Sequence, residues 1–380
     1  MSSKRLRLGL DIEAARAATE KMDKLDQDTT KAIREAREAR IRRLEQLDVQ
    51  ADAMKRATSK YRRFDNGDHP DIRIRRRFLR LATARPRRES NPRLKTVRGD
   101  VDTRPVLTSL IHRPSNALQV YLSLLYTAHL EFEPGDRWKN ERPNNGVDGW
   151  SELCGLLALD VSNRELNLRM TRALAKLAEH DLVRVGARRS EHRFDRFTLF
   201  CEDRSRKRYF VPSEETGAVI LPAGFFMAGW HLVLTNEEMA TLLAVAEQTQ
   251  RPRSRKDADE AGVALPQLTR WQWYGLAPEA FSARHELQEF GLIDMFDPMD
   301  RTNGKLSENQ RQKDLLRAPR ITLKLGDVDF SRPAIEVVKA KLQKPVAPRW
   351  EDRAIALQLI DNNRQWRERP PMGSPHHGEK

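Results

Sequence analysis

The chain contains two copies of one short phrase, and this repeat constrains its fold more than any other feature. LAEHDLV at 177–183 matches LQEFGLI at 287–293, an offset of 110 residues; two leucines and a glutamate are shared, and valine is replaced by isoleucine. Each phrase ends a segment with helical apolar spacing and leads into residues that alternate as a half-buried strand does. The repeat therefore predicts two similar units in series.

The first copy predicts three helices followed by a hairpin. The helices are expected at 117–131, 149–159 and 164–180. Ser162 and Glu165 have the spacing of a capping box, which marks the start of the third helix. A hairpin is expected to follow, up to Cys201.

The second copy repeats this order with insertions. A strand-like stretch comes first, at 218–230, and Thr235 with Glu238 forms a second capping box. Helices are then expected at 237–248, 266–274 and 278–290, and strands at 293–296 and 320–325. We expect core positions, rather than ligand contacts, for the aromatic residues Trp271, Trp273 and Tyr274.

This order of elements resembles the winged-helix DNA-binding families, most clearly in RELNLRMTRALAKLAEHDLVRVGAR and YGLAPEAFSARHELQEFGLIDMF. A looser resemblance is to plasmid replication initiators. The resemblance implies a mainly α fold with small β-hairpins and two tandem winged-helix domains, at 106–202 and 203–330. It also implies double-stranded DNA as a partner.

The resemblance places DNA contacts on the last helix of each copy and on the hairpin, because that helix enters the major groove in helix-turn-helix proteins. In the first copy the expected contacts are Arg164, Asn167, Arg169, Arg172 and Lys176 on the helix, and Arg188, Arg189 and Arg193 on the wing. In the second copy they are Ser282 and Arg284, although the nearby Glu279 and Glu286 would repel phosphate. The alternative for the first copy is that these residues form a solvated helix face and a polar hairpin. The alternative for the second copy is that its last helix packs against the first copy or forms a dimer contact.

Most of the chain's excess positive charge lies in one short stretch. Residues 55–98 hold 16 Lys/Arg and 4 Asp/Glu, whereas the whole chain has a net charge of +14. Such a block gains free energy by displacing counterions from a polyanion. We therefore predict an Arg-rich basic arm at 59–105, largely irregular over 65–105 with one short helix at 75–84. Nucleic-acid contacts are expected from Arg73, Arg75, Arg76, Arg77, Arg80, Arg85, Arg87 and Arg88. A passive linker, or an arm on a protein or lipid surface, is the alternative.

The two ends of the chain have simpler patterns. Residues 1–58 are expected to form one or two amphipathic helices, with apolar residues such as Met22, Leu25, Leu44 and Leu47 at spacings of three and four. This stripe could form a homodimeric coiled coil or pack on its own chain. Residues 331–380 are expected to hold one or two helices, at 333–342 and 350–366, and a disordered tail.

Motifs for catalysis, cofactors and metals are missing from the sequence. It has no phosphate-binding Walker loop, no nucleophile elbow and no CxxC pair. Its two cysteines exclude a disulfide framework, and it has no apolar run long enough for a membrane span and no secretory signal. We therefore expect a cytoplasmic, nucleoid-associated protein without enzymatic activity, cofactor or metal; a nuclease built from dispersed carboxylates stays open.

The leading hypothesis is a sequence-specific double-stranded DNA-binding protein, acting as a transcription regulator or a replication initiator. Two alternative hypotheses assign the protein to other functional classes. One is an oligomeric assembly or scaffold protein whose winged helices bind protein. The other is an RNA-binding protein that uses the Arg-rich arm.

Overall fold

The structure, a computed structural model, describes residues 9–65, 67–85, 104–111, 115–146, 148–157, 162–190, 192–214, 217–252, 261–296 and 319–346. The chain divides into two units. The larger unit comprises residues 43–296 and 318–343, and the smaller comprises 1–42, 297–317 and 344–380. The described residues are mainly helical with small antiparallel sheets, as the sequence predicts.

The N-terminal helix is a single uninterrupted element. Helix α1 spans Gly9–Phe64. Its C-terminal part belongs to the larger unit, where Leu47, Met54 and Tyr61 are buried in the hydrophobic core. That part of the predicted stripe therefore packs on its own chain, while the side chains of Met22 and Leu25 lie outside the described residues.

The first copy has the predicted order of three helices and a hairpin. Its elements are α4 (Ala117–Glu131), α5 (Trp150–Leu153), α6 (Asn163–Glu179), β2 (Val183–Arg184) and β3 (Thr198–Leu199). Strands β2 and β3 pair antiparallel, with Val183 opposite Leu199. The second helix is only one turn long, shorter than the sequence predicts, and α3 (Val106–Ile111) precedes the copy.

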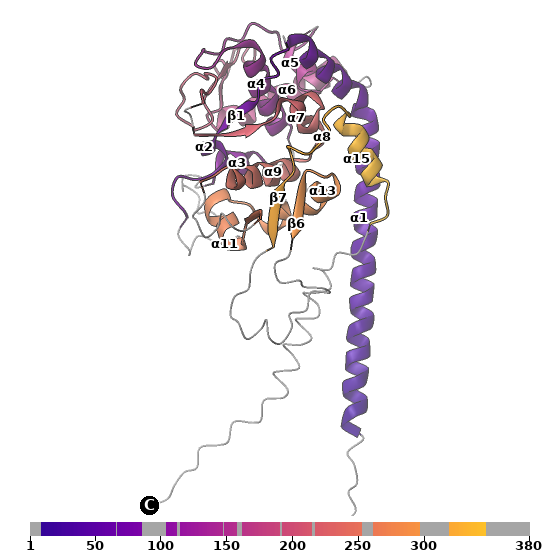
Figure 1. Cartoon of the computed structure of the whole chain (residues 1–380). Helices are drawn as coiled ribbons and strands as arrows, with labels where there is room; N and C mark the ends of the chain where they lie inside the picture. The colour runs from indigo at the N-terminus through magenta and orange to yellow at the C-terminus, as the bar shows by residue number, and fades with distance from the viewer. Residues whose placement is uncertain are drawn as a thin grey trace, which may run out of the picture. The chain divides into compact units, whose positions relative to one another are not determined.

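The second copy follows the same order and adds a strand. Its elements are α9 (Asn236–Thr249), β5 (Val263–Ala264), α11 (Gln267–Thr269), η2 (Arg270–Tyr274), α12 (Pro278–Ser282), α13 (Arg284–Glu289), β6 (Ile293–Phe296) and β7 (Arg320–Leu323). The strands form one antiparallel sheet in the order β5-β7-β6, of which Figure 1 labels β6 and β7. The capping box at Thr235 and Glu238 is present in full. Three further helices flank the copy: α7 (Ala223–Met227), α8 (Trp230–Val233) and α15 (Ala334–Leu342).

The repeated phrase ends both third helices with the same hydrogen bonds. The N–H of Leu182 donates to the carbonyl of Leu177 at 3.0 Å, and the N–H of Leu292 donates to that of Leu287, also at 3.0 Å. This six-to-one bond is typical of a Schellman cap, which requires a left-handed residue just after the helix. Asp181, at φ 56°, and Gly291, at φ 80°, fill that position in the two copies. The structure thus explains why aspartate can replace glycine in the first phrase.

The basic arm predicted at 59–105 is called the basic segment from here on. Its described residues up to 85 belong to the larger unit. Strand β1 (Ile72–Arg75) pairs antiparallel with β4 (Ala218–Leu221), and α2 (Arg76–Leu79) follows. Ile72, Ile74 and Phe78 between the arginines are fully buried. The prediction of a largely irregular arm is therefore wrong for residues 72–79, where these apolar side chains anchor β1 and α2, while α2 falls within the short helix predicted at 75–84.

Both copies and the basic segment contribute to one hydrophobic core. Leu122 of α4, Leu174 of α6 and Leu243 of α9 are all fully buried within it. The boundary expected near residue 202 therefore does not separate two cores. Among the described residues, no helix has the length and apolar character needed to cross a membrane.

Candidate nucleic-acid interface

Helix α6 has one apolar face and one face open to solvent. Ser162 caps its start by accepting a hydrogen bond from the N–H of Glu165 at 3.3 Å, so half of the predicted capping box forms. Leu166, Met170 and Leu177 are buried, whereas Arg164, Leu168 and Arg172 are exposed. Residues four apart are neighbours on a helix surface. The exposed side chains therefore form one stripe, in which Leu168, 43% exposed, stands between two arginines.

The hairpin after α6 carries exposed arginines in its loop. Arg188 and Arg189 are both exposed. The N–H of Gly186 donates to the carbonyl of Arg193 at 2.6 Å, which closes the base of the loop. The guanidinium of Arg193 lies 5.0 Å from the centroid of the Phe194 ring. The wing thus presents cations on a loop that is fixed at its base.

An asparagine-rich loop, residues 140–146, joins the wing to α6. Asn140 donates to the carbonyl of Phe197 at 3.1 Å, and Asn144 donates to that of Phe194 at 3.0 Å. The amide of Asn145 is hydrogen-bonded to Asn167 on α6. The sequence reasoning did not select these residues, although the dipeptide Asn144-Asn145 followed by glycine is a turn signal. Their contacts hold the predicted recognition helix and the wing in one arrangement.

The predicted cations of the first copy differ in whether they are paired. Arg169 forms an ion pair with Glu165 at 2.5 Å, and Lys176 lies 3.8 Å from Glu179. Within the part of the chain that the structure describes, no ion pair involves Arg164, Arg172, Arg188 or Arg189. The helix stripe and the wing therefore hold positive charge that no described carboxylate compensates.

Most of the described arginines of the basic segment have partners within the protein. Arg73 pairs with Glu214 at 3.0 Å, and Arg76 pairs with Glu247 at 3.0 Å. Of the other predicted positions, Arg75 pairs with Glu202, Arg80 and Arg85 lie over tryptophan rings, and Arg87 and Arg88 lie outside the described residues. Among the described members of the set, Arg77 is the exposed one, and it has no ion pair with a described residue. The prediction that these arginines act together on nucleic acid is therefore not supported for Arg75 and Arg85, which are buried.

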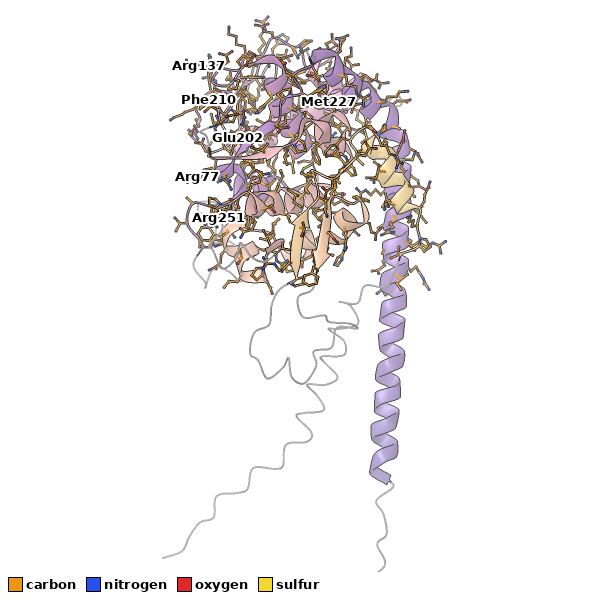
Figure 2. The ribbon with its side chains drawn as sticks, viewed as in Figure 1. Arg77, Arg137, Glu202, Phe210, Met227 and Arg251 are labelled. Atoms are coloured by element: carbon orange, nitrogen blue, oxygen red, sulfur yellow. The ribbon has the colours of Figure 1, made fainter. Side chains whose placement is uncertain are left out.

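The pair between Arg75 and Glu202 is the most enclosed of these ion pairs, and Figure 2 labels Glu202. Glu202 is fully buried and accepts from the guanidinium of Arg75 at 2.5 Å and from its backbone N–H at 3.2 Å. A second guanidinium nitrogen donates to the carbonyl of Phe210 at 2.8 Å. Burial raises the pKa of Glu202, and the charge of Arg75 opposes that rise. The pair joins β1 to the end of the first copy.

The third helix of the second copy offers little free positive charge. Ser282 donates to the carbonyl of Glu279 at 2.6 Å, and Arg284 donates to that of Phe281 at 3.1 Å. The guanidinium of Arg284 also lies 4.8 Å from the Phe281 ring centroid. Both predicted contact residues of this copy are therefore engaged with their own helix.

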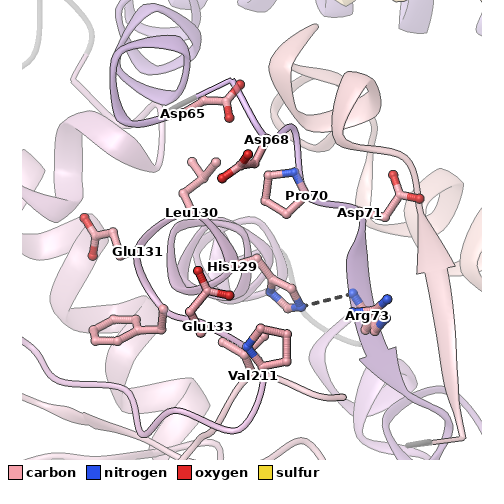
Figure 3. A pocket seen from close by; sticks show the side chains of 12 residues that line it. Asp65, Asp68, Pro70, Asp71, Arg73, His129, Leu130, Glu131, Glu133 and Val211 are labelled. Atoms are coloured by element: carbon pink, nitrogen blue, oxygen red, sulfur yellow. Dashed lines mark hydrogen bonds between the residues drawn. The ribbon is translucent and has the colours of Figure 1, made fainter. Parts of the chain in front are cut away.

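A pocket of about 350 Å³ lies beside β1 and the end of α4. Its lining includes Asp65, Asp68, Asp71, Glu131 and Glu133, and Figure 3 shows these carboxylates around it. His129 accepts a hydrogen bond there from the N–H of Arg73 at 3.1 Å. An acidic lining repels phosphate, which places this pocket outside a nucleic-acid interface.

The chain was also compared with known proteins. No family model, no curated protein and no solved structure matches it.

Proposed function

We propose that this protein binds double-stranded DNA through two tandem winged-helix domains, and that the first of them reads sequence. The observation that carries the proposal is the uncompensated stripe of Arg164, Leu168 and Arg172 on α6, beside the arginine-bearing wing. A protein surface gains little from keeping such cations unpaired, whereas a polyanion compensates them.

The element order of both copies supports the winged-helix assignment. In each, the last helix ends in the same cap and leads directly into a strand of an antiparallel pair. The carbonyl after that cap accepts a strand hydrogen bond in both copies, Leu182 from Phe200 at 2.8 Å and Leu292 from Lys324 at 2.9 Å. The two copies thus share a hydrogen-bond pattern as well as a sequence phrase.

The roles follow from the chemistry of the exposed side chains. Arg164 lies in the first turn of α6, the part of a recognition helix that reaches base edges, and arginine reads guanine through two hydrogen bonds. Leu168 offers an apolar contact for a thymine methyl group. Arg188 and Arg189 on the wing would bind backbone phosphate. Such a protein would serve as a transcription regulator or a replication initiator.

The wing is tested by removing two phosphate contacts. Arg188→Ala with Arg189→Ala is expected to reduce the slope of log affinity against log salt by about 2 in magnitude, because each lost contact with B-DNA contributes about 0.9. Sequence preference should persist. Fluorescence anisotropy on a labelled duplex, at several salt concentrations, measures both. If the unmodified protein does not bind duplex at low salt, the proposal is wrong.

The helix is tested through selectivity. Arg164→Ala is expected to reduce discrimination at one position of the preferred site by about 1–3 kcal/mol, the value of one bidentate base contact. Selection from random duplex DNA identifies that site, and competition titrations with single-base variants measure the change. Unaltered selectivity would place the reading surface elsewhere. Binding to RNA alone, or self-assembly without nucleic-acid binding, would favour the RNA-binding or the scaffold alternative.

A further inference from the structure

Residues 80–85 lie against the π-helix η2 of the second copy and are fixed there by backbone hydrogen bonds. The N–H of Leu81 donates to the carbonyl of Trp273 at 3.0 Å, and that of Arg85 donates to Gln272 at 3.1 Å. The side chain of Gln272 donates back to the carbonyl of Arg85 at 2.9 Å. These bonds set the position of the arginine at the start of the segment.

Arg80 lies over an aromatic ring. Its guanidinium carbon lies 3.7 Å from the centroid of the Trp273 ring. A stacked guanidinium keeps its N–H groups in the ring-parallel plane, where they can donate to an anion. The Nε of Arg80 is buried and has no hydrogen-bond partner among the described residues. That nitrogen is enclosed, so any contact of the half-buried Arg80 with an anion from solvent would come from the other nitrogens of its guanidinium.

Two further arginines lie next to this position. Arg76 donates to the backbone carbonyl of Gln250 at 2.8 Å, and this bond joins α2 to the end of α9. Arg77 follows Arg76 in the chain and Arg251 follows Gln250, so the two flank the bond; Figure 2 labels both. Arg77 and Arg251 are exposed.

The positive charge of this group is only partly balanced by nearby acidic groups. Burial lowers the pKa of Arg80 and the charges of Arg251 and Arg76 lower it further, whereas Tyr274 and Glu247 oppose the fall. Within the described ranges, no ion pair involves Arg77, Arg80 or Arg251, whereas Arg76 is paired with Glu247. Like charges this close repel one another, and a bound anion would relieve the repulsion.

We infer that Arg77, Arg80 and Arg251 form a phosphate-binding site that contacts the backbone of the same DNA duplex. This inference rests on the proposed function and deepens it, because it assigns the second copy its own contact. The contact would come from the junction of α2, α9 and η2 rather than from α13, whose Arg284 lies over Phe281. Arginine forks match phosphate oxygens, and the stacked Arg80 is already oriented.

The test uses the full chain and removes the two exposed cations while leaving the Arg80 stack intact. Arg77→Ala with Arg251→Ala is compared with a control, Arg332→Ala with Lys344→Ala, which removes two exposed cations that flank α15 in the sequence. Affinity for a labelled random duplex of about 40 base pairs is measured from 50 to 300 mM salt. For one or two lost phosphate contacts, we expect binding at 0.1 M salt to weaken by roughly 8- to 60-fold and the salt slope to fall by about 1–2 in magnitude.

Three results decide between the possibilities. If the variant and the control have the same affinity and slope while the unmodified protein binds, this site is wrong and the proposed function stands. If the unmodified protein does not bind duplex, both are wrong. Arg77→Lys with Arg251→Lys should retain the slope, because lysine also displaces counterions; a loss as large as that of the alanine variant would also overturn the site.

Discussion

Arg75→Met is expected to destabilise the protein by about 3–5 kcal/mol, because it leaves the carboxylate of Glu202 buried without its counter-charge. Glu202 is fully buried, and Arg75 is 8% exposed. Urea unfolding followed by circular dichroism measures the free energy of unfolding. The result would show that a residue in the most basic part of the sequence is a structural one.

Two further variants test whether the loss of stability comes from the buried position of Arg75 and from its charge. Arg77→Met, two positions along the chain and exposed, should change the free energy of unfolding by no more than about 0.5 kcal/mol. Arg75→Met with Glu202→Gln should recover much of the loss, since the neutral amide oxygen can still accept from the backbone N–H of residue 75. A cost below about 1 kcal/mol for Arg75→Met alone would contradict the buried pair.

The free energy of unfolding is expected to fall as the pH falls from 7 to 5, because two buried histidines stay neutral in the folded chain. Burial lowers the pKa of His129 to about 4 and that of His231 to about 3. In the unfolded chain both would titrate near their ordinary pKa of about 6.5. Unfolding therefore takes up protons below that pH. Between pH 7 and 5, each histidine lowers the free energy of unfolding of the protein by about 2 kcal/mol, and the two together lower it by about 4 kcal/mol.

The hydrogen bonds of the two rings suggest suitable substitutions. His129 donates from Nδ1 to the carbonyl of Leu125 at 2.8 Å and accepts at Nε2 from Arg73, which fixes a neutral ring. His231 lies 3.2 Å from the hydroxyl of Tyr61. Glutamine can replace the Nε2 contact in each case. Buried Glu202 and Glu238, whose pKa values are raised by burial, act in the opposite direction.

The variants therefore isolate the histidine contribution from that of the carboxyl groups. His129→Gln and His231→Gln should each reduce the stability difference between pH 7 and pH 5 by about 2 kcal/mol. Urea unfolding at both pH values measures that difference. An unchanged difference in both variants would contradict neutral, buried histidines in the folded protein.

Elements with a strong local pattern were predictable from the sequence. The helix at 117–131 and the strand at 293–296 were predicted to the residue, because the local spacing of apolar residues determines them. Thr235 and Glu238 gave the start of α9 for the same reason. In each case the signal lies within a few residues of the element itself.

Features that depend on distant partners were missed. The strand at Ile72–Arg75 pairs with residues that lie more than a hundred positions later, at Ala218–Leu221. Its many neighbouring arginines also made the alternation of its two isoleucines difficult to recognise as a strand pattern. The partner of Arg75 is equally distant in sequence, and nothing near Glu202 marks it as buried. Charge counts describe what a segment contains, but burial decides which of those charges can reach a ligand.

The pairing of β1 with β4 has a consequence for how the molecule meets its neighbours. A ladder of two strands leaves backbone groups along both outer edges, where strands from other molecules can add. Here His129 and Glu202 accept from the outward N–H groups of Arg73 and Arg75, and Gln250 bonds to both backbone groups of Ile220, each at 2.7 Å. The side chains of His129, Glu202 and Gln250 thus make the hydrogen bonds that a neighbouring strand would otherwise make at these positions. At these positions the ladder is therefore closed to the addition of a strand from another molecule.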